Sequence, residues 1–114
     1  MNALITCSGV SNTGKLTTEA AQTLLRRKPG QFAWAHAKQS AATLAAEAGD
    51  ADRVIVIDGC TDRCASKKLA AAGIDPDIRI IATGLGIAKN GMADVQFHEI
   101  ETVIAAITKE ITGD

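Results

Sequence analysis

Residues 53–64, Arg-Val-Ile-Val-Ile-Asp-Gly-Cys-Thr-Asp-Arg-Cys, form the stretch that decides the fold. Four consecutive β-branched residues follow the first arginine, a run typical of a strand buried on both faces of a parallel sheet. An Asp-Gly pair then ends the strand, and Cys60 and Cys64 follow. The pattern becomes helical from Thr61 onward, with Thr61 or Asp62 as the predicted cap. Two thiols are therefore predicted where a buried strand passes into a helix, which is the edge where open α/β sheets bind ligands.

Strands and helices alternate along the rest of the chain. Further strands are predicted at residues 3–7, 31–37 and 78–83, and further helices at 15–27, 40–48 and from about residue 100 to the C-terminus. Residues 95–97 are a candidate for a short edge strand. This order predicts one α/β domain over residues 1–114, a three-layer sandwich of Rossmann or flavodoxin type. Its parallel sheet should have four or five strands in the order 2-1-3-4.

Composition narrows the classes of function. A net charge of −1 and an aromatic content of 3% argue against nucleic acid as a partner, because there is little to neutralise phosphates or stack on bases. No run approaches the ~18 apolar residues of a membrane span, and the first residues do not resemble a signal peptide. We therefore expect a cytoplasmic protein with reduced thiols. In a reducing compartment, 3 cysteines suggest metal or redox chemistry rather than a disulfide framework.

The cysteines should meet at one edge of the sheet, since the carboxyl ends of parallel strands share that edge. Cys7 ends the first strand, and Cys60 and Cys64 follow the central one. A spacing of four would place the latter two on one helical face if the helix includes both. A helix N-terminus favours thiolates, which are ligands for zinc. His36 is a candidate fourth ligand; Asp58 is another, or it anchors the turn. The alternative is that these thiols only fill core space, as free cysteines commonly do.

A metal-free alternative is a thiol redox enzyme. Cys60, at the start of the predicted helix, would be the nucleophile, and Cys64 would resolve the mixed disulfide. A thiol phosphatase with Cys7 as nucleophile fits poorly, because the loop after Cys7 offers Lys15 but no arginine to hold the oxyanion.

The segment from Gly9 to Leu16 comes close to the phosphate-binding pattern G-x4-G-K-[S/T] between a strand and a helix. It departs from that pattern at Leu16, where a hydroxyl should bind magnesium, and Thr17 comes one residue late. Nucleotide hydrolysis is therefore disfavoured. The loop Gly9–Gly14 would either bind a small anion or nucleotide through backbone N–H groups or simply position the helix.

Residues 7–16 and 57–64 resemble the two motifs of the small bacterial and archaeal DGC-domain family. The family is named for a tripeptide that is present here as Asp58-Gly59-Cys60. The similarity covers almost the whole chain and includes the glycines after residue 83. It implies a zinc-binding protein whose reaction is undefined.

The resemblance also implies a ligand set. Cys7, Cys60 and Cys64 fall on family cysteines that are thought to bind metal. The family has a further cysteine between the two motifs, where this chain has residues 32–36 instead. His36 would then replace it, or the metal would keep an open position, or metal binding has been lost. We expect a zinc-binding protein with Cys7, Cys60, Cys64 and His36 as ligands.

Overall fold

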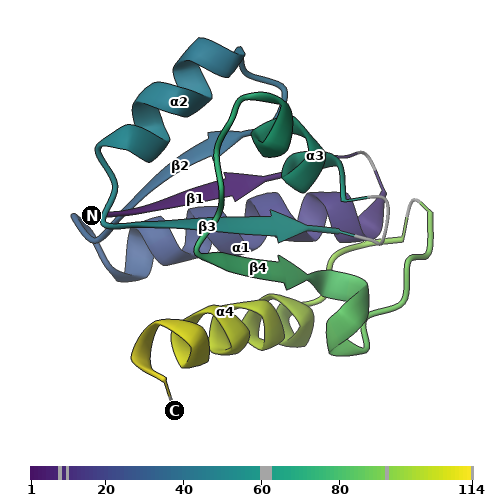
Figure 1. The fold of residues 1–114 in the computed structure, drawn as a ribbon. Coiled ribbons are helices and arrows are strands. Elements are labelled where there is room, and N and C mark those ends of the chain that lie inside the picture. The colour runs from purple at the N-terminus through teal and green to yellow at the C-terminus, as the bar shows by residue number, and fades with distance from the viewer. Residues whose placement is uncertain (8, 10, 60–62, 92, 114) are drawn as a thin grey trace.

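A parallel sheet forms the middle layer of the computed structural model, which describes residues 1–7, 9, 11–59, 63–91 and 93–113 (Figure 1). The elements in chain order are β1 (Asn2–Thr6), α1 (Asn12–Arg27), β2 (Phe32–His36), α2 (Ala41–Gly49), β3 (Arg53–Asp58), α3 (Cys64–Ala71), β4 (Ile78–Ile81), the 3-10 turn η1 (Ala82–Leu85) and α4 (Phe97–Thr112). The strand order is β2-β1-β3-β4, and every neighbouring pair is parallel. The α/β class and the predicted 2-1-3-4 order are confirmed.

Helices cover both faces of the sheet, so the molecule has three layers (Figure 1). The helices α1 and α4 cover one face, and α2 and α3 cover the other. The β-branched run of β3 is fully buried between them, as its sequence predicted. The core against α1 and α4 comprises Leu4, Leu16, Ala20, Ala21, Leu24, Phe32, Ile55, Ile57, Ile78, Ile80, Ala82, Ile87, Val103, Ile104 and Ile107. The core against α2 and α3 comprises Ile5, Ala35, Ala37, Leu44, Val54, Val56, Ala65 and Leu69.

Helix caps explain where α1 and α2 begin. The Gly14 N–H donates to Ser11 Oγ at 3.3 Å, so α1 starts at Asn12, three residues before the predicted start. The Thr43 N–H donates to Ser40 Oγ at 3.2 Å, which confirms the predicted cap of α2.

Two predictions near the C-terminal half were wrong. The strand β4 ends at Ile81, because residues 82–85 turn into the 3-10 helix η1. Residues 95–97 do not form an edge strand: Phe97 is the first residue of α4, and the Gln96 N–H donates to Glu99 Oε1 at 2.8 Å as part of the helix cap. Four strands, not five, are present among the described residues.

Within the described residues, no helix combines the length and the apolar character needed to cross a lipid bilayer.

Candidate functional site

Cys7 lies directly after β1, at the carboxyl edge of the sheet. Its N–H donates to the carbonyl of Ile57 at 3.1 Å, so it is held against the end of β3. Its side chain is half-buried and packs against the core beneath α2 and α3. Its Sγ lies 3.7 Å from Thr17 Oγ1 of α1, whose hydroxyl donates to the Gly14 carbonyl at 2.8 Å. The thiol is therefore fixed at the point where the two helical layers meet at the end of the sheet.

Asp58 anchors the start of α3. The Ala65 N–H donates to Asp58 Oδ1 at 2.8 Å, and the Ser66 N–H and hydroxyl donate to Oδ2 at 3.3 and 2.6 Å. A carboxylate at the end of a strand thus satisfies the free N–H groups that a cap residue would otherwise satisfy. Both oxygens are engaged, so the structure supports Asp58 as the anchor of the turn rather than as a ligand.

Cys64 is the first residue of α3 and is exposed. The residue before it, Arg63, has a left-handed backbone with φ 49°, so the helix does not extend back to Thr61 as predicted. The shared helical face of Cys60 and Cys64 was predicted only for a helix that includes both residues, and α3 as described begins with Cys64. Cys60 and the two predicted cap residues lie outside the described residues.

Glycines join the two sequence motifs at this edge. A Cβ on Gly59 would lie 2.8 Å from the carbonyl carbon of Thr13 and 2.9 Å from the nitrogen of Gly14. A Cβ on Gly14 would lie 2.6 Å from the carbonyl carbon of Gly9. Three backbone segments therefore touch in a way that only glycine allows. Sequence analysis read the glycines as turn residues and missed these contacts, although their position beside the cysteines was a signal.

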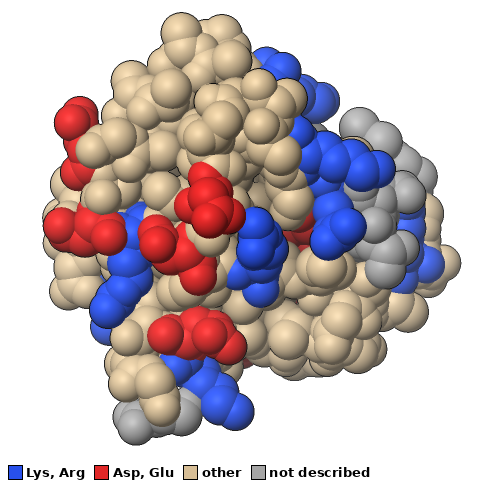
Figure 2. Space-filling model, in the orientation of Figure 1, with Lys and Arg blue, Asp and Glu red and all other residues tan. Residues whose placement is uncertain are grey.

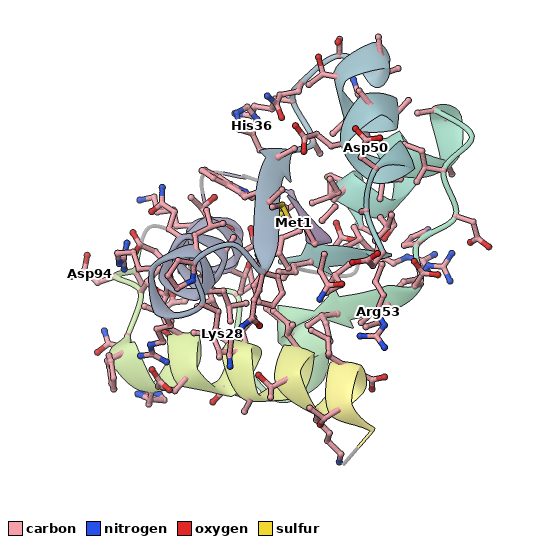
Figure 3. All side chains as sticks on the ribbon, turned by 90° about the vertical axis from the view of Figure 1, so that its left-hand side faces the viewer. Met1, Lys28, His36, Asp50, Arg53 and Asp94 are labelled. Atoms are coloured by element: carbon pink, nitrogen blue, oxygen red, sulfur yellow. The ribbon has the colours of Figure 1, made fainter. Side chains whose placement is uncertain are left out.

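His36 ends β2, which pairs with β1 so that Thr6 lies opposite His36. Its ring centroid is 6.0 Å from that of Trp34, and Trp34 packs against the core beneath α1 and α4. Figure 3 shows His36 at the far end of β2, with its side chain directed away from the strand. Its Nδ1 is buried without a hydrogen-bond partner. The histidine therefore lies toward the face opposite to α3, which begins with Cys64.

The family model of the DGC domain matches residues 3–107. The chain belongs to the DGC-domain family. Comparison with curated proteins and comparison with solved structures gave no match. In this DGC domain, the first two residues of the tripeptide Asp58-Gly59-Cys60 have structural roles, since one anchors α3 and the other contacts α1.

Asn12 is a site residue that sequence analysis missed. Its side chain is 4% exposed, donates to the Ala88 carbonyl at 2.9 Å and accepts from the Asn90 N–H at 2.7 Å. Its own N–H donates to the Gly91 carbonyl at 2.8 Å. One residue thereby fastens the segment before α4 to the start of α1. Nothing in the local sequence distinguishes this asparagine, because its partners lie more than 70 residues away.

Several backbone N–H groups that would bind an anion in a phosphate loop already donate hydrogen bonds within the protein. The N–H of Asn12 is bound to Gly91, the N–H of Gly14 to Ser11 Oγ, and the N–H of Lys15 to the Ser11 carbonyl at 2.9 Å. An anion at this helix end would have to displace them. The geometry fits a loop that positions α1.

No group of three or more His, Cys, Asp and Glu side chains able to hold a metal ion occurs within the described part of this DGC domain. Cys7 and Cys64 follow neighbouring strands at one edge, and Cys60 lies outside the described residues. The described residues thus include two of the three predicted thiol ligands, which is fewer than the three or four protein ligands that a zinc site needs.

Charge is distributed unevenly over the face drawn in Figure 2. The right-hand side, where the strands of Figure 1 end, carries Lys and Arg with very little Asp or Glu, which lie mainly at the left and centre. Exposed Arg63 and Lys67 at the start of α3 belong to this edge. Positive side chains close to a thiol favour its thiolate form and attract anionic ligands.

Proposed function

We propose that this protein binds zinc at the carboxyl edge of its sheet through Cys7, Cys60 and Cys64, in the reducing environment of the cytoplasm. The observation that carries the proposal is the connection between the first and last of these cysteines. Cys7 is hydrogen-bonded to the end of β3, and the next residue of β3, Asp58, holds the first turn of the helix that begins with Cys64. Exposed Arg63 and Lys67 at the start of α3 would favour the thiolate form that zinc requires.

Further support comes from unsatisfied polar atoms. Among the described residues, His36 Nδ1, Gln39 Oε1 and Thr83 Oγ1 are the buried side-chain atoms without a hydrogen-bond partner. All three residues lie at the end of β2 or after β2 and β4, at the carboxyl edge. Buried polar atoms normally have partners, so these atoms, at the ends of the two outer strands, leave positions at this edge that a ligand or water could meet.

The fourth zinc position is proposed to hold water or a substrate rather than His36. Trp34 and His36 lie together on the side of α1 and α4, whereas Cys64 starts a helix on the other side. Three protein ligands with an open position are typical of catalytic zinc, which polarises a bound water or carbonyl.

The test is metal content per chain, measured by mass spectrometry on protein purified without chelator. About one zinc per wild-type chain is expected. Cys7→Ser and Cys64→Ser should both lose most of it, because each removes one thiolate. His36→Ala is the matched control at the same edge and should retain zinc. A wild-type protein that holds no zinc, and whose melting temperature added zinc does not raise, would refute the proposal.

A second candidate function is thiol–disulfide exchange, favoured by the exposure of Cys64 at the first position of α3. One thiolate would attack a substrate disulfide, and the second thiol would resolve the mixed disulfide, leaving a Cys60–Cys64 disulfide and a reduced substrate. Here Cys7→Ser should leave activity intact. Alkylation rates of the metal-free protein at neutral pH separate the two functions, since only exchange requires one thiol to react much faster than a free cysteine.

A further inference from the structure

A cavity of ≈ 520 Å³ lies between the first turns of α1, the segment before α4, and α4 itself. It is lined by Gly9, Lys15, Thr18, Glu19, Ala93, Asp94, Val95 and Ile100. Its volume falls in the range of about 300–1,000 Å³ that small-molecule sites occupy. Neither Cys7 nor Cys64 lines it, so it is distinct from the part of the proposed zinc site that the structure describes.

Three charged side chains line the cavity and are left unpaired. Lys15, Glu19 and Asp94 are exposed, and none of their side chains makes an ion pair or hydrogen bond in the described structure. Lys15 and Glu19 are one helical turn apart, a spacing that permits pairing, yet they remain separate. Figure 3 shows Asp94 beside α1, on the chain that leads into α4. The cavity thus presents one cation and two carboxylates.

The positive and negative groups differ in position. Lys15 is in the first turn of α1, where the helix dipole adds to its positive charge. Glu19 lies one turn further along α1, and Asp94 lies on the segment before α4. Val95 and Ile100 add partly buried apolar surface that is continuous with the core against α1 and α4. A ligand that meets all of these groups has an anionic end, a cationic end and a short aliphatic part.

We propose that this cavity binds an aliphatic amino acid in its zwitterionic form. The carboxylate of the ligand meets Lys15, its ammonium group meets Asp94 and Glu19, and its side chain lies against Val95 and Ile100. Charge-assisted hydrogen bonds at both ends would then fix its orientation. The site gives the protein a small-molecule ligand independent of the metal.

The test uses L-leucine as the probe, titrated into the reduced, metal-free protein and followed by NMR chemical shifts. Leucinamide, which lacks the carboxylate, and 4-methylpentanoate, which lacks the ammonium group, are the comparison ligands. Lys15→Met should weaken leucine binding roughly tenfold and leave leucinamide binding unchanged. Asp94→Asn should weaken leucine and leucinamide by a similar factor and leave 4-methylpentanoate unchanged. Lys67→Met, an exposed lysine outside the cavity, is the control and should change nothing.

Both substituted residues are exposed, so the variants should fold, as unchanged melting temperatures would confirm. The proposal is overturned if about 20 mM leucine moves no signal of residues 93–95 and Ile100. It is also overturned if Lys15→Met and Lys67→Met have the same effect. Because the protein is metal-free in this experiment, the result does not depend on whether zinc binds the cysteines.

Discussion

The two faces of the sheet differ in the length of the helices that cover them and in the size of the apolar core beneath those helices. The face under α1 and α4 has two helices of 16 residues and a core rich in Leu and Ile. The face under α2 and α3 has helices of 9 and 8 residues, and α2 buries one residue, Leu44. Cys7 packs against the thinner face, and Cys64 belongs to it. The face under α1 and α4 therefore commits more apolar surface to the core, and Cys7 and Cys64 lie where less is committed.

We call the face under α1 and α4 the thick face and the face under α2 and α3 the thin face. The largest expected loss of stability comes from truncating a core leucine on the thick face. Leu24→Ala should lower the free energy of unfolding by about 2–5 kcal/mol, because the side chain is 1% exposed and its space cannot easily be refilled. Urea denaturation measures this loss. The matched variant on the thin face is Leu44→Ala, where the side chain is 0% exposed.

Leu44→Ala should act locally instead. Since α2 has no other buried residue, losing this contact should free α2 from the sheet while the rest stays folded. Hydrogen exchange should then show lost protection in residues 41–49, with a smaller change in global stability than Leu24→Ala causes. Equal global losses and unchanged exchange in α2 would contradict the difference between the faces.

The next largest loss of stability is expected at the backbone contact between Gly59 and the start of α1. Gly59→Ala should destabilise the protein by about 1–3 kcal/mol, because the added Cβ would meet backbone atoms of Thr13 and Gly14, which cannot move aside cheaply. The control is Gly84→Ala, where the added Cβ would meet Ile81 Cβ at an ordinary 3.8 Å. Thermal unfolding should separate the two variants clearly. A Gly59→Ala protein as stable as Gly84→Ala would show that the motifs are not in contact as described.

The sequence was sufficient to predict the fold class, the strand order and the presence of α1, because these follow from local periodicity and chain direction. Leu16, Ala20 and Leu24 recur at helical spacing, and the β-branched run of β3 is apolar throughout. These signals lie within one element each. The same information placed Cys7 and the start of α3 at one edge of the sheet, since parallel strands end on one side.

The contacts that build the candidate site could not be predicted from local sequence patterns. Asp58 caps α3 from a strand, so the helix begins three residues later than Thr61, and Asn12 binds residues 88–91. Gly59 is required by the approach of α1, a segment more than 40 residues away. Each contact depends on which distant segment of the backbone packs beside the residue in the folded protein. A single sequence does not reveal that packing.

A fourth prediction concerns the hydrogen bonds that hold α3 on the thin face. Asp58→Asn should cost about 1–3 kcal/mol, because the amide nitrogen would replace one of two buried acceptors that receive N–H and O–H donors from α3. Asp77→Asn is the control at the opposite edge: its carboxylate accepts from the Val54 N–H at 2.8 Å but is exposed, so its loss should matter less. Chemical denaturation compares the two. Similar losses would mean that the anchor of α3 is no stronger than a surface contact.

The smallest effect is expected from the ion pair between Arg27 and Glu101, which joins α1 to α4 on the thick face. The hydrogen bond from Arg27 lowers the pKa of Glu101 in the folded protein, and the opposite charge adds to it. Its stabilisation is therefore present above the unfolded carboxyl pKa of about 4.3 and is lost as the pH falls through the lower folded value. Glu101→Gln should be slightly less stable than wild type at pH 7, and the difference should disappear below that range and in high salt.

The matched control is Glu110→Gln, since Glu110 is exposed on the same helix and has no ion pair among the described residues. Thermal unfolding from pH 3 to 7 should show a pH-dependent difference for Glu101→Gln and none for Glu110→Gln. A difference at Glu101 as large as that of Leu24→Ala would reverse the comparison, because the thick face would then depend on its surface charges. A small one fits a face held by apolar packing, where an exposed pair between α1 and α4 adds little.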